Sequence, residues 1–165
     1  MKILFVCSSN ICRSPYAELM FKKIVGENEV LKKNIESVKS TAVFNKSKKI
    51  FRKTANALLE DGVSQSEIDA FTPDFKWCNP EKLREADIII GMSEFNRLCT
   101  PCKYWKKYKN LSVAAIGKNV GIPDPAFSTS DGYYRDTMDI IKTFLNVYAE
   151  KLIEEFQKNQ TSDNA

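Results

Sequence analysis

The stretch from Lys2 to Met20 constrains the fold of this chain most strongly, because an apolar run is followed by a polar loop and then by a helical pattern. The run from Ile3 to Val6 is branched and aromatic, as in a strand buried on both faces. Pro15 and the apolar residues after it are typical of a helix start. The sequence therefore predicts a strand, a loop and a helix, and the loop leads directly into the helix N-terminus.

The predicted loop has residues suited to holding an anion. The N–H groups of a first helical turn lack intrahelical partners, and the aligned peptide dipoles favour negative charge there. Cys7 begins the loop, and Arg13 and the hydroxyl of Ser14 end it. A guanidinium matches two oxygens of a phosphate, and a thiolate beneath the same anion is placed to attack phosphorus. The pattern Cys-x5-Arg-Ser thus indicates nucleophilic chemistry on a phosphate group.

The chain contains no histidine, which excludes several kinds of active site. Cys-His pairs, Ser-His-Asp triads and histidine-ligated metals are all ruled out. The loop itself must favour the thiolate, since a helix N-terminus and a nearby cation lower the pKa of a cysteine from ~8.5 to roughly 3.5–7.5. We therefore expect neither a metal nor another cofactor.

The composition indicates one globular domain. The chain has 165 residues and 43% hydrophobic content, enough for one sizeable core. We expect a single domain over residues 1–158 and a disordered polar tail over residues 159–165.

Charge and cysteine content restrict the expected partners and location. The net charge of +4 favours acidic or phosphorylated partners and does not indicate nucleic acid. No apolar run approaches the ~20 residues of a membrane span, and the N-terminal run is too short for a signal peptide. Five cysteines, an odd number, suit reduced thiols better than a disulfide framework. We expect a cytoplasmic protein without a membrane partner.

Strand and helix patterns alternate along the rest of the chain. Strands are expected within residues 3–6, 35–38, 86–92 and 111–116, and a long amphipathic helix over residues 134–156 is expected to pack on the sheet. Such alternation predicts a parallel sheet with right-handed crossovers. Ligands of these sheets bind beyond the carboxyl ends of the strands, which is where Cys7 is expected.

A second candidate for chemistry is Asp124, which lies between Pro123 and Pro125. Two prolines limit backbone freedom and so can aim the carboxylate. A phenol oxygen leaves poorly unless it is protonated as the P–O bond breaks, and a carboxylic acid can supply that proton. Alone, the segment is equally consistent with a plain turn. In a chain that also has Cys-x5-Arg, a general acid is the favoured interpretation.

The segment Val6–Pro15, together with Ile122–Pro125, resembles the low-molecular-weight protein tyrosine phosphatase family, and weaker similarity at residues 35–37 and 86–92 extends the resemblance over nearly the whole chain. The resemblance implies a single-domain, three-layer α/β/α fold with a four-stranded parallel sheet of order 2-1-3-4. It implies hydrolysis of phosphotyrosine in protein substrates, and of small aryl phosphates, through a phosphocysteine. The catalytic residues that it implies are Cys7, Arg13 and Asp124. The implied phosphate-binding loop and its support are Ser8, Ser9, Asn10, Ile11, Cys12 and Ser14.

The resemblance also implies supporting roles. Ser37 corresponds to a serine that supports the loop, and Cys12 is expected to form a disulfide with Cys7 that shields the nucleophile from over-oxidation. Ser14 is expected to hydrogen-bond the sulfur of Cys7. Family members often have a histidine that supports the loop asparagine, so the network around Asn10 must be built differently here.

The sequence departs from the family at the substrate pocket. Two tyrosines usually follow the Asp-Pro, whereas this chain has Ala126 and Phe127. One aromatic wall is therefore missing or comes from elsewhere, and Phe44, Phe127 and Tyr133 are the candidates.

Two positions inside the loop also bear on the substrate. Ser9 stands where the family usually has glycine, so the loop backbone is expected to differ slightly. Ile11 favours a phosphotyrosine pocket, because relatives that resemble protein-arginine phosphatases have threonine there.

Other functions remain open. An arsenate reductase shares this loop but needs a relay of two further cysteines; Cys78, Cys99 and Cys102 keep this possibility open, although their spacing does not match the expected relay. A protein-arginine phosphatase is a further alternative. A non-catalytic phosphoprotein-binding module is disfavoured, because nucleophile, arginine and acid are all present.

Overall fold

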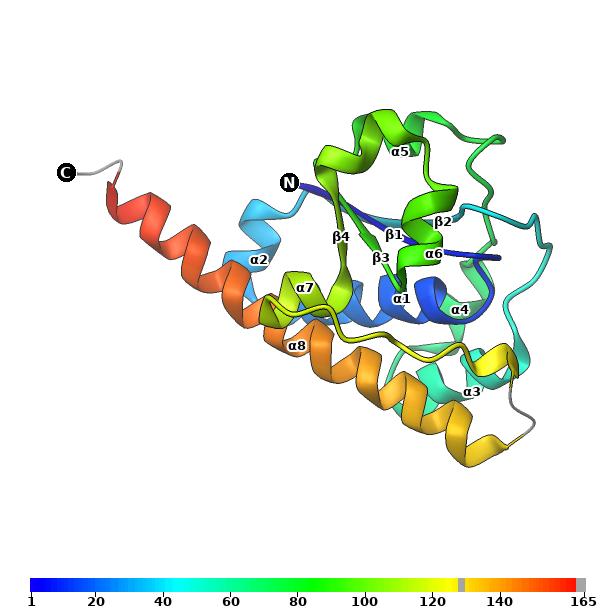
Figure 1. The fold of residues 1–165 in the computed structure, drawn as a ribbon. Coiled ribbons are helices and arrows are strands. Elements are labelled where there is room, and N and C mark those ends of the chain that lie inside the picture. Colours follow the sequence, from blue (N-terminus) through cyan, green and yellow to red (C-terminus); the bar gives the residue numbers. More distant parts are fainter. Residues whose placement is uncertain (128–129, 163–165) are drawn as a thin grey trace.

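The computed structural model describes residues 1–127 and 130–162, and its centre is a four-stranded parallel sheet between two helical layers (Figure 1). The strands are β1 (Lys2–Cys7), β2 (Ser37–Ala42), β3 (Ile88–Gly91) and β4 (Tyr108–Asn110). Their order in the sheet is β2-β1-β3-β4, and every pairing is parallel. The predicted α/β fold and strand order are confirmed.

Helices cover both faces of the sheet. The α-helices are α1 (Arg13–Gly26), α2 (Glu29–Asn34), α3 (Arg52–Glu60), α4 (Gln65–Ala70), α5 (Glu81–Glu85), α6 (Glu94–Cys99), α7 (Leu111–Ile116) and α8 (Asp131–Ser162). Two 3-10 helices are η1 (Cys102–Lys107) and η2 (Pro125–Phe127). Helices α1, α7 and α8 lie on one side of the sheet, and α5 and α6 lie on the other (Figure 1). Within the described residues, none of the helices has an apolar stretch long enough to cross a membrane.

Strand β1 divides the core between the two faces. Ile3, Phe5 and Cys7 belong to the larger apolar cluster on the α1 side, whereas Leu4 and Val6 belong to the smaller cluster on the α5 side. This alternation is the period of two expected of a strand buried on both faces. Cys7 therefore ends the central strand on the side where α1 begins.

One predicted strand is wrong, because residues 111–116 form helix α7 and the fourth strand is the preceding β4. A short apolar run cannot be assigned to strand or helix by periodicity alone. Ala114 and Ala115 favour a helix, and Gly117 ends it in the left-handed conformation, with φ of 71°.

Other boundaries also differ from the prediction. Strand β2 runs over Ser37–Ala42 rather than residues 35–38. Helix α8 is longer than residues 134–156, and it packs mainly against α1, α2 and α7 rather than directly on the strands. Residues 159–162, which were expected in a disordered tail, continue α8, and this stretch has no glycine or proline to stop it. Residues 163–165 lie outside the described part of the chain.

A buried carboxylate joins three helices on the α1 side. Asp61, directly after α3, accepts hydrogen bonds from the hydroxyl of Tyr16 at 2.6 Å, from Arg135 at 2.8 Å and from Lys142 at 2.7 Å. Burial raises the pKa of Asp61, but the hydrogen bonds from these three side chains outweigh it and lower the pKa to about 2. The charged form of Asp61 therefore stabilises the packing of α1, α3 and α8.

We expect Asp61→Asn to lower the free energy of unfolding at pH 7 by about 2 kcal/mol, because two cations and a hydroxyl lose their anionic partner. Urea titrations of both proteins measure this difference. It should shrink below pH ~4, where an unfolded aspartate gains its proton, and vanish as the pH falls through the folded-state pKa of about 2.

The matched control is Asp136→Asn, on the exposed surface of α8, which should change the free energy of unfolding by less than about 0.5 kcal/mol. Equal effects of the two substitutions, or a difference independent of pH, would contradict this role of Asp61.

Candidate active site

The loop of residues 8–12 joins β1 to α1 at the carboxyl end of the sheet, and the predicted nucleophile lies at its start (Figure 1). The side chain of Cys7 is buried, and the hydroxyl of Ser14 donates a hydrogen bond to its sulfur at 2.9 Å. Arg13 is the first residue of α1. The loop thus brings Cys7 to the N-terminus of α1, where the helix dipole favours negative charge.

The loop conformation depends on Asn10, whose φ of 54° is left-handed. Its side chain is fully buried, and its amide donates to the hydroxyl of Ser14 at 2.9 Å and to the hydroxyl of Ser40 at 2.7 Å. Its amide oxygen accepts a hydrogen bond from the backbone N–H of Asp74 at 2.8 Å. Three hydrogen bonds therefore hold a backbone conformation that is costly for most residues.

The supporting serine is Ser40 and not Ser37. Ser37 pairs with Lys2, at the opposite end of β1 from Cys7, whereas Ser40 pairs with Phe5 and reaches the loop. The hydroxyl of Ser40 also donates to the buried carboxylate of Glu18 at 2.6 Å. In this chain without histidine, Ser40 and the backbone of residue 74 complete the network around Asn10.

The predicted acid lies beside the predicted guanidinium, although the two are far apart in the sequence. Arg13 is almost completely buried, and its guanidinium donates a hydrogen bond to the carboxylate of Asp124. A second, longer hydrogen bond of 3.5 Å reaches the carbonyl oxygen of Ile122. The other oxygen of Asp124 accepts from the backbone N–H of Ala126 at 3.1 Å, which orients the carboxylate.

Two adjoining hollows lie at these residues. The smaller, of about 70 Å³, is lined by Cys7, Ser8, Ser9, Ile11, Cys12, Arg13, Asp124 and Ala126. The larger, of about 520 Å³, shares five of these residues and adds Phe44, Asn45, Ser93, Phe95 and Ile122. A small polar hollow with a cation inside a wider, partly apolar pocket suits an oxyanion attached to a larger group.

Of the three aromatic residues predicted as pocket candidates, the structure places Phe44 in a hollow and Tyr133 outside both hollows. Phe44 lines the larger hollow, and its ring packs edge-to-face on that of Phe95, with the ring centroids 5.3 Å apart. Phe127 ends η2, but its side chain lies outside the described part of the structure. Tyr133 lies in α8 and lines neither hollow.

Sequence reasoning missed Phe95. The available signal was an exposed aromatic residue at the start of a helix that directly follows a buried strand, since such positions lie at the ligand-binding edge of a parallel sheet.

The remaining cysteines lie elsewhere or are packed. Cys78, Cys99 and Cys102 line neither hollow, so the structure does not bring them to Cys7. Cys12 is half-buried beside Tyr134, and burial raises the pKa of its thiol. All five cysteines are free thiols, and a disulfide between Cys7 and Cys12 stays a prediction.

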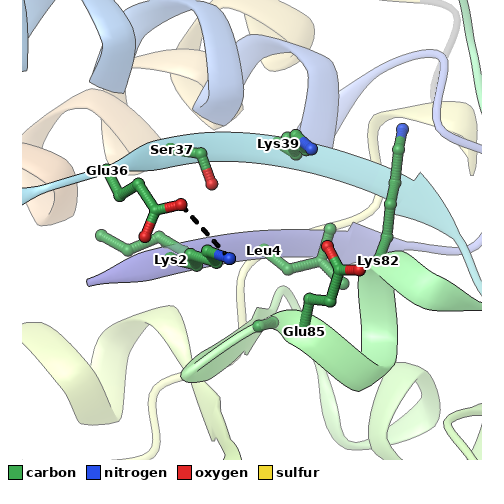
Figure 2. Close-up of a pocket in the computed structure, with 9 residues that line it drawn as sticks. Lys2, Leu4, Glu36, Ser37, Lys39, Lys82 and Glu85 are labelled. Carbon is green, nitrogen blue, oxygen red and sulfur yellow. Dashed lines mark ion pairs between the residues drawn. The ribbon is translucent and has the colours of Figure 1, made fainter.

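Another hollow, of about 200 Å³, lies between β1, β2 and α5 (Figure 2). Lys2 at its edge forms an ion pair with Glu36 at 3.2 Å, and Lys39, Lys82 and Glu85 lie around it (Figure 2). Its lining mixes both signs of charge and contains no cysteine. It therefore lacks the nucleophile and the acid that meet at the other end of β1.

Comparisons with known proteins identify relatives of this chain. The family model described as low molecular weight phosphotyrosine protein phosphatase matches residues 2–160. A protein-arginine-phosphatase of Bacillus subtilis is 29% identical over 156 residues, covering 92% of this chain and 97% of that protein. The low molecular weight protein-tyrosine-phosphatase PtpB of Staphylococcus epidermidis is 27% identical over 134 residues, or 81% of this chain and 86% of that protein.

Among solved structures, a variant of the arginine phosphatase YwlE with a phosphorylated active-site serine is 26% identical. Its TM-score is 0.78, and the match covers 92% of this chain and 95% of that one. The match of the family model over residues 2–160 shows that this chain belongs to the low molecular weight phosphotyrosine protein phosphatase family.

Proposed function

We propose that this phosphatase hydrolyses phosphotyrosine in proteins through a phosphocysteine formed on Cys7. The observation that carries the proposal is the convergence of Cys7, Arg13 and Asp124 on one hollow. These side chains supply a nucleophile, an oxyanion-binding cation and a proton donor, which are the groups that a phosphomonoester hydrolase of this kind requires.

In the first step, the sulfur of Cys7 attacks phosphorus and the bond to the tyrosyl oxygen breaks. Arg13 and the N–H groups of the loop bind the non-bridging oxygens, and Asp124 donates a proton to the departing phenol. The hydrogen bond between Arg13 and Asp124 supports an ordered sequence, because a bound phosphoryl group competes for the guanidinium and frees the carboxyl for the leaving oxygen.

In the second step, a water molecule attacks the phosphocysteine, and Asp124 takes its proton. The S–P bond breaks, inorganic phosphate leaves and the thiolate of Cys7 is regenerated. The hydrogen bond from Ser14 to the sulfur, at 2.9 Å, stabilises the negative charge that returns to it. In the solved arginine phosphatase variant, the active-site serine carries the phosphoryl group, which supports a covalent intermediate at the corresponding position.

The choice of phosphotyrosine rests on the walls of the two hollows. Ile11 lines the smaller hollow, where relatives that resemble arginine phosphatases have threonine. Phe44 and Phe95 line the larger one and suit the flat ring of a tyrosine. Phosphoarginine is the second candidate, because the relative with 29% identity is a protein-arginine-phosphatase. Arsenate reduction is less supported, since Cys78, Cys99 and Cys102 line neither hollow.

Replacing the nucleophile tests the covalent mechanism. We expect Cys7→Ser to abolish release of phosphate from p-nitrophenyl phosphate, because a neutral hydroxyl is a far weaker nucleophile than a thiolate. Binding of inorganic phosphate, measured by calorimetry, should be retained, since Arg13 and the loop remain. Cys78→Ser, at an exposed thiol, is the control and should keep full activity. Near-native turnover by Cys7→Ser would refute the assignment.

Replacing the acid tests proton donation. We expect Asp124→Asn to lower kcat for a phosphotyrosine peptide by about 10²–10³, within the usual range for loss of a general acid. The loss should be smaller for p-nitrophenyl phosphate, because its leaving group needs less help from a proton. The exposed Asp136→Asn should leave both rates unchanged. Equal losses on the two substrates would argue against a proton-donating role.

A substrate comparison tests the choice between tyrosine and arginine. We expect the wild-type protein to have a higher kcat/KM for a phosphotyrosine peptide than for a phosphoarginine peptide. Ile11→Thr should move the ratio of the two values at least about tenfold toward phosphoarginine, because the smaller polar side chain changes the wall of the inner hollow. Faster release of phosphate from phosphoarginine by the wild type, or thioredoxin-coupled reduction of arsenate, would overturn the proposed substrate.

A further inference from the structure

The larger hollow, which we call the outer pocket, has aromatic side chains on one side. Phe44, after β2, and Phe95, in α6, both line it. Their rings contact each other with an angle of 68° between the ring planes. Both rings are large and about half exposed, at 55% and 48%. Ala126 lies in η2, which contacts α8, on the other side of the sheet from α6. The described aromatic side chains of the larger hollow are therefore those of Phe44 and Phe95, and the described lining from residues 122–126 is not aromatic.

The backbone of Phe44 and the side chain of Asn96, which follows Phe95, both hydrogen-bond to Ser8 in the 8–12 loop. The backbone N–H of Phe44 donates to the carbonyl oxygen of Ser8 at 3.0 Å. The side chain of Asn96, next to Phe95, donates to the hydroxyl of Ser8 at 3.3 Å. Since Ser8 directly follows Cys7, these hydrogen bonds hold the backbone of Phe44 and the neighbour of Phe95 near the sulfur.

Hydrogen bonds to Tyr108 and to the backbone of Met92 also hold the start of helix α6. The hydroxyl of Tyr108 donates to the carbonyl oxygen of Ser93 at 2.9 Å, and the buried Asn96 accepts from the backbone N–H of Met92 at 3.3 Å. A Cβ atom at Gly91 would lie 1.6 Å from the Tyr108 hydroxyl, so this contact requires glycine. The residues on both sides of Phe95 are thus held in place before any substrate arrives, which lowers the entropic cost of binding.

The geometry points to the Phe44–Phe95 pair as the wall that binds the aromatic group of the substrate, with Phe95 as a specificity-determining residue. This inference rests on the proposed phosphotyrosine hydrolysis and names the side chains that select the aryl group. A tyrosyl ring whose phosphate lies over Cys7 can pack on this pair in an offset or edge-to-face arrangement. The pair supplies, from the segment after β2 and from α6, an aromatic surface that Ala126 does not supply from η2.

Binding of two phosphonates tests the wall without turnover. Calorimetry should show that the wild type binds phenylphosphonate at least about tenfold more tightly than methylphosphonate, since one favourable aromatic contact is worth about one order of magnitude. Phe95→Ser should remove most of this preference and leave the affinity for methylphosphonate unchanged. For a phosphotyrosine peptide, Phe95→Ser should raise KM about tenfold with little change in kcat.

A second substitution tests whether an aromatic side chain at residue 126 can replace that of Phe95. Phe95→Ser combined with Ala126→Tyr should recover the preference for phenylphosphonate, because a ring on the opposite side can bind the same group. Phe95→Tyr should keep it. Leu98→Ser, at an exposed position of the same helix, is the matched control and should change neither affinity.

The outcomes separate this inference from the proposed function. An unchanged preference for phenylphosphonate in Phe95→Ser, or equal weakening of both phosphonates, would overturn the aromatic wall even if the wild type hydrolyses phosphotyrosine. If the wild type instead prefers phosphoarginine, the proposed function fails. The preference for phenylphosphonate over methylphosphonate, and its loss in Phe95→Ser, would still decide whether Phe44 and Phe95 form an aromatic binding wall.

Discussion

The buried amide of Asn10 is the interaction on which the rest of the site depends. Its three hydrogen bonds connect the 8–12 loop to α1 through Ser14, to β2 through Ser40 and to the backbone of residue 74. A left-handed residue in a surface loop would relax without such partners. Here the buried Asn10 anchors the loop, so the N–H groups that bind an oxyanion under the proposed mechanism are oriented before the anion arrives, and no reorganisation is needed during the reaction.

The same network shows how a chain without histidine supports this loop. A backbone N–H at residue 74 and the hydroxyl of Ser40 are neutral groups, and neither changes its charge near neutral pH. The carboxylate of Glu18 accepts a hydrogen bond from Ser40, and a second carboxylate, Asp124, contacts Arg13. Because a buried guanidinium is costly without a partner, Asp124 or a phosphoryl group must satisfy it. Under the proposed mechanism, binding of the anion and release of the acid are therefore one event.

Much of this arrangement follows from local sequence, and the rest depends on register and packing. Cys-x5-Arg-Ser after an apolar run predicts the strand, the loop and the helix, because each signal lies within a few residues. The choice between Ser37 and Ser40 depends on the pairing of β2 with β1, which no local pattern determines. Residues 111–116 are mostly apolar, a pattern that fits a buried strand as well as a buried helix, and their packing in the core together with the left-handed Gly117 decides for a helix. The place of Phe95 after a buried strand could have indicated the ligand-binding edge, but its contact with Phe44 could not be predicted, because the two rings meet only in the folded protein.

The origin of the pocket walls explains how one loop can serve different substrates. The 8–12 loop is held by α1, β2 and residue 74, whereas the outer walls come from the segments after β2, at the start of α6 and at η2. A substitution at Ala126 or Phe95 changes a wall without removing any hydrogen bond that holds Asn10. Relatives described as an arginine phosphatase and as a tyrosine phosphatase match this chain at 29% and 27% identity. Substrate choice in this chain should therefore follow the few side chains around the pocket mouth rather than the fold that they share.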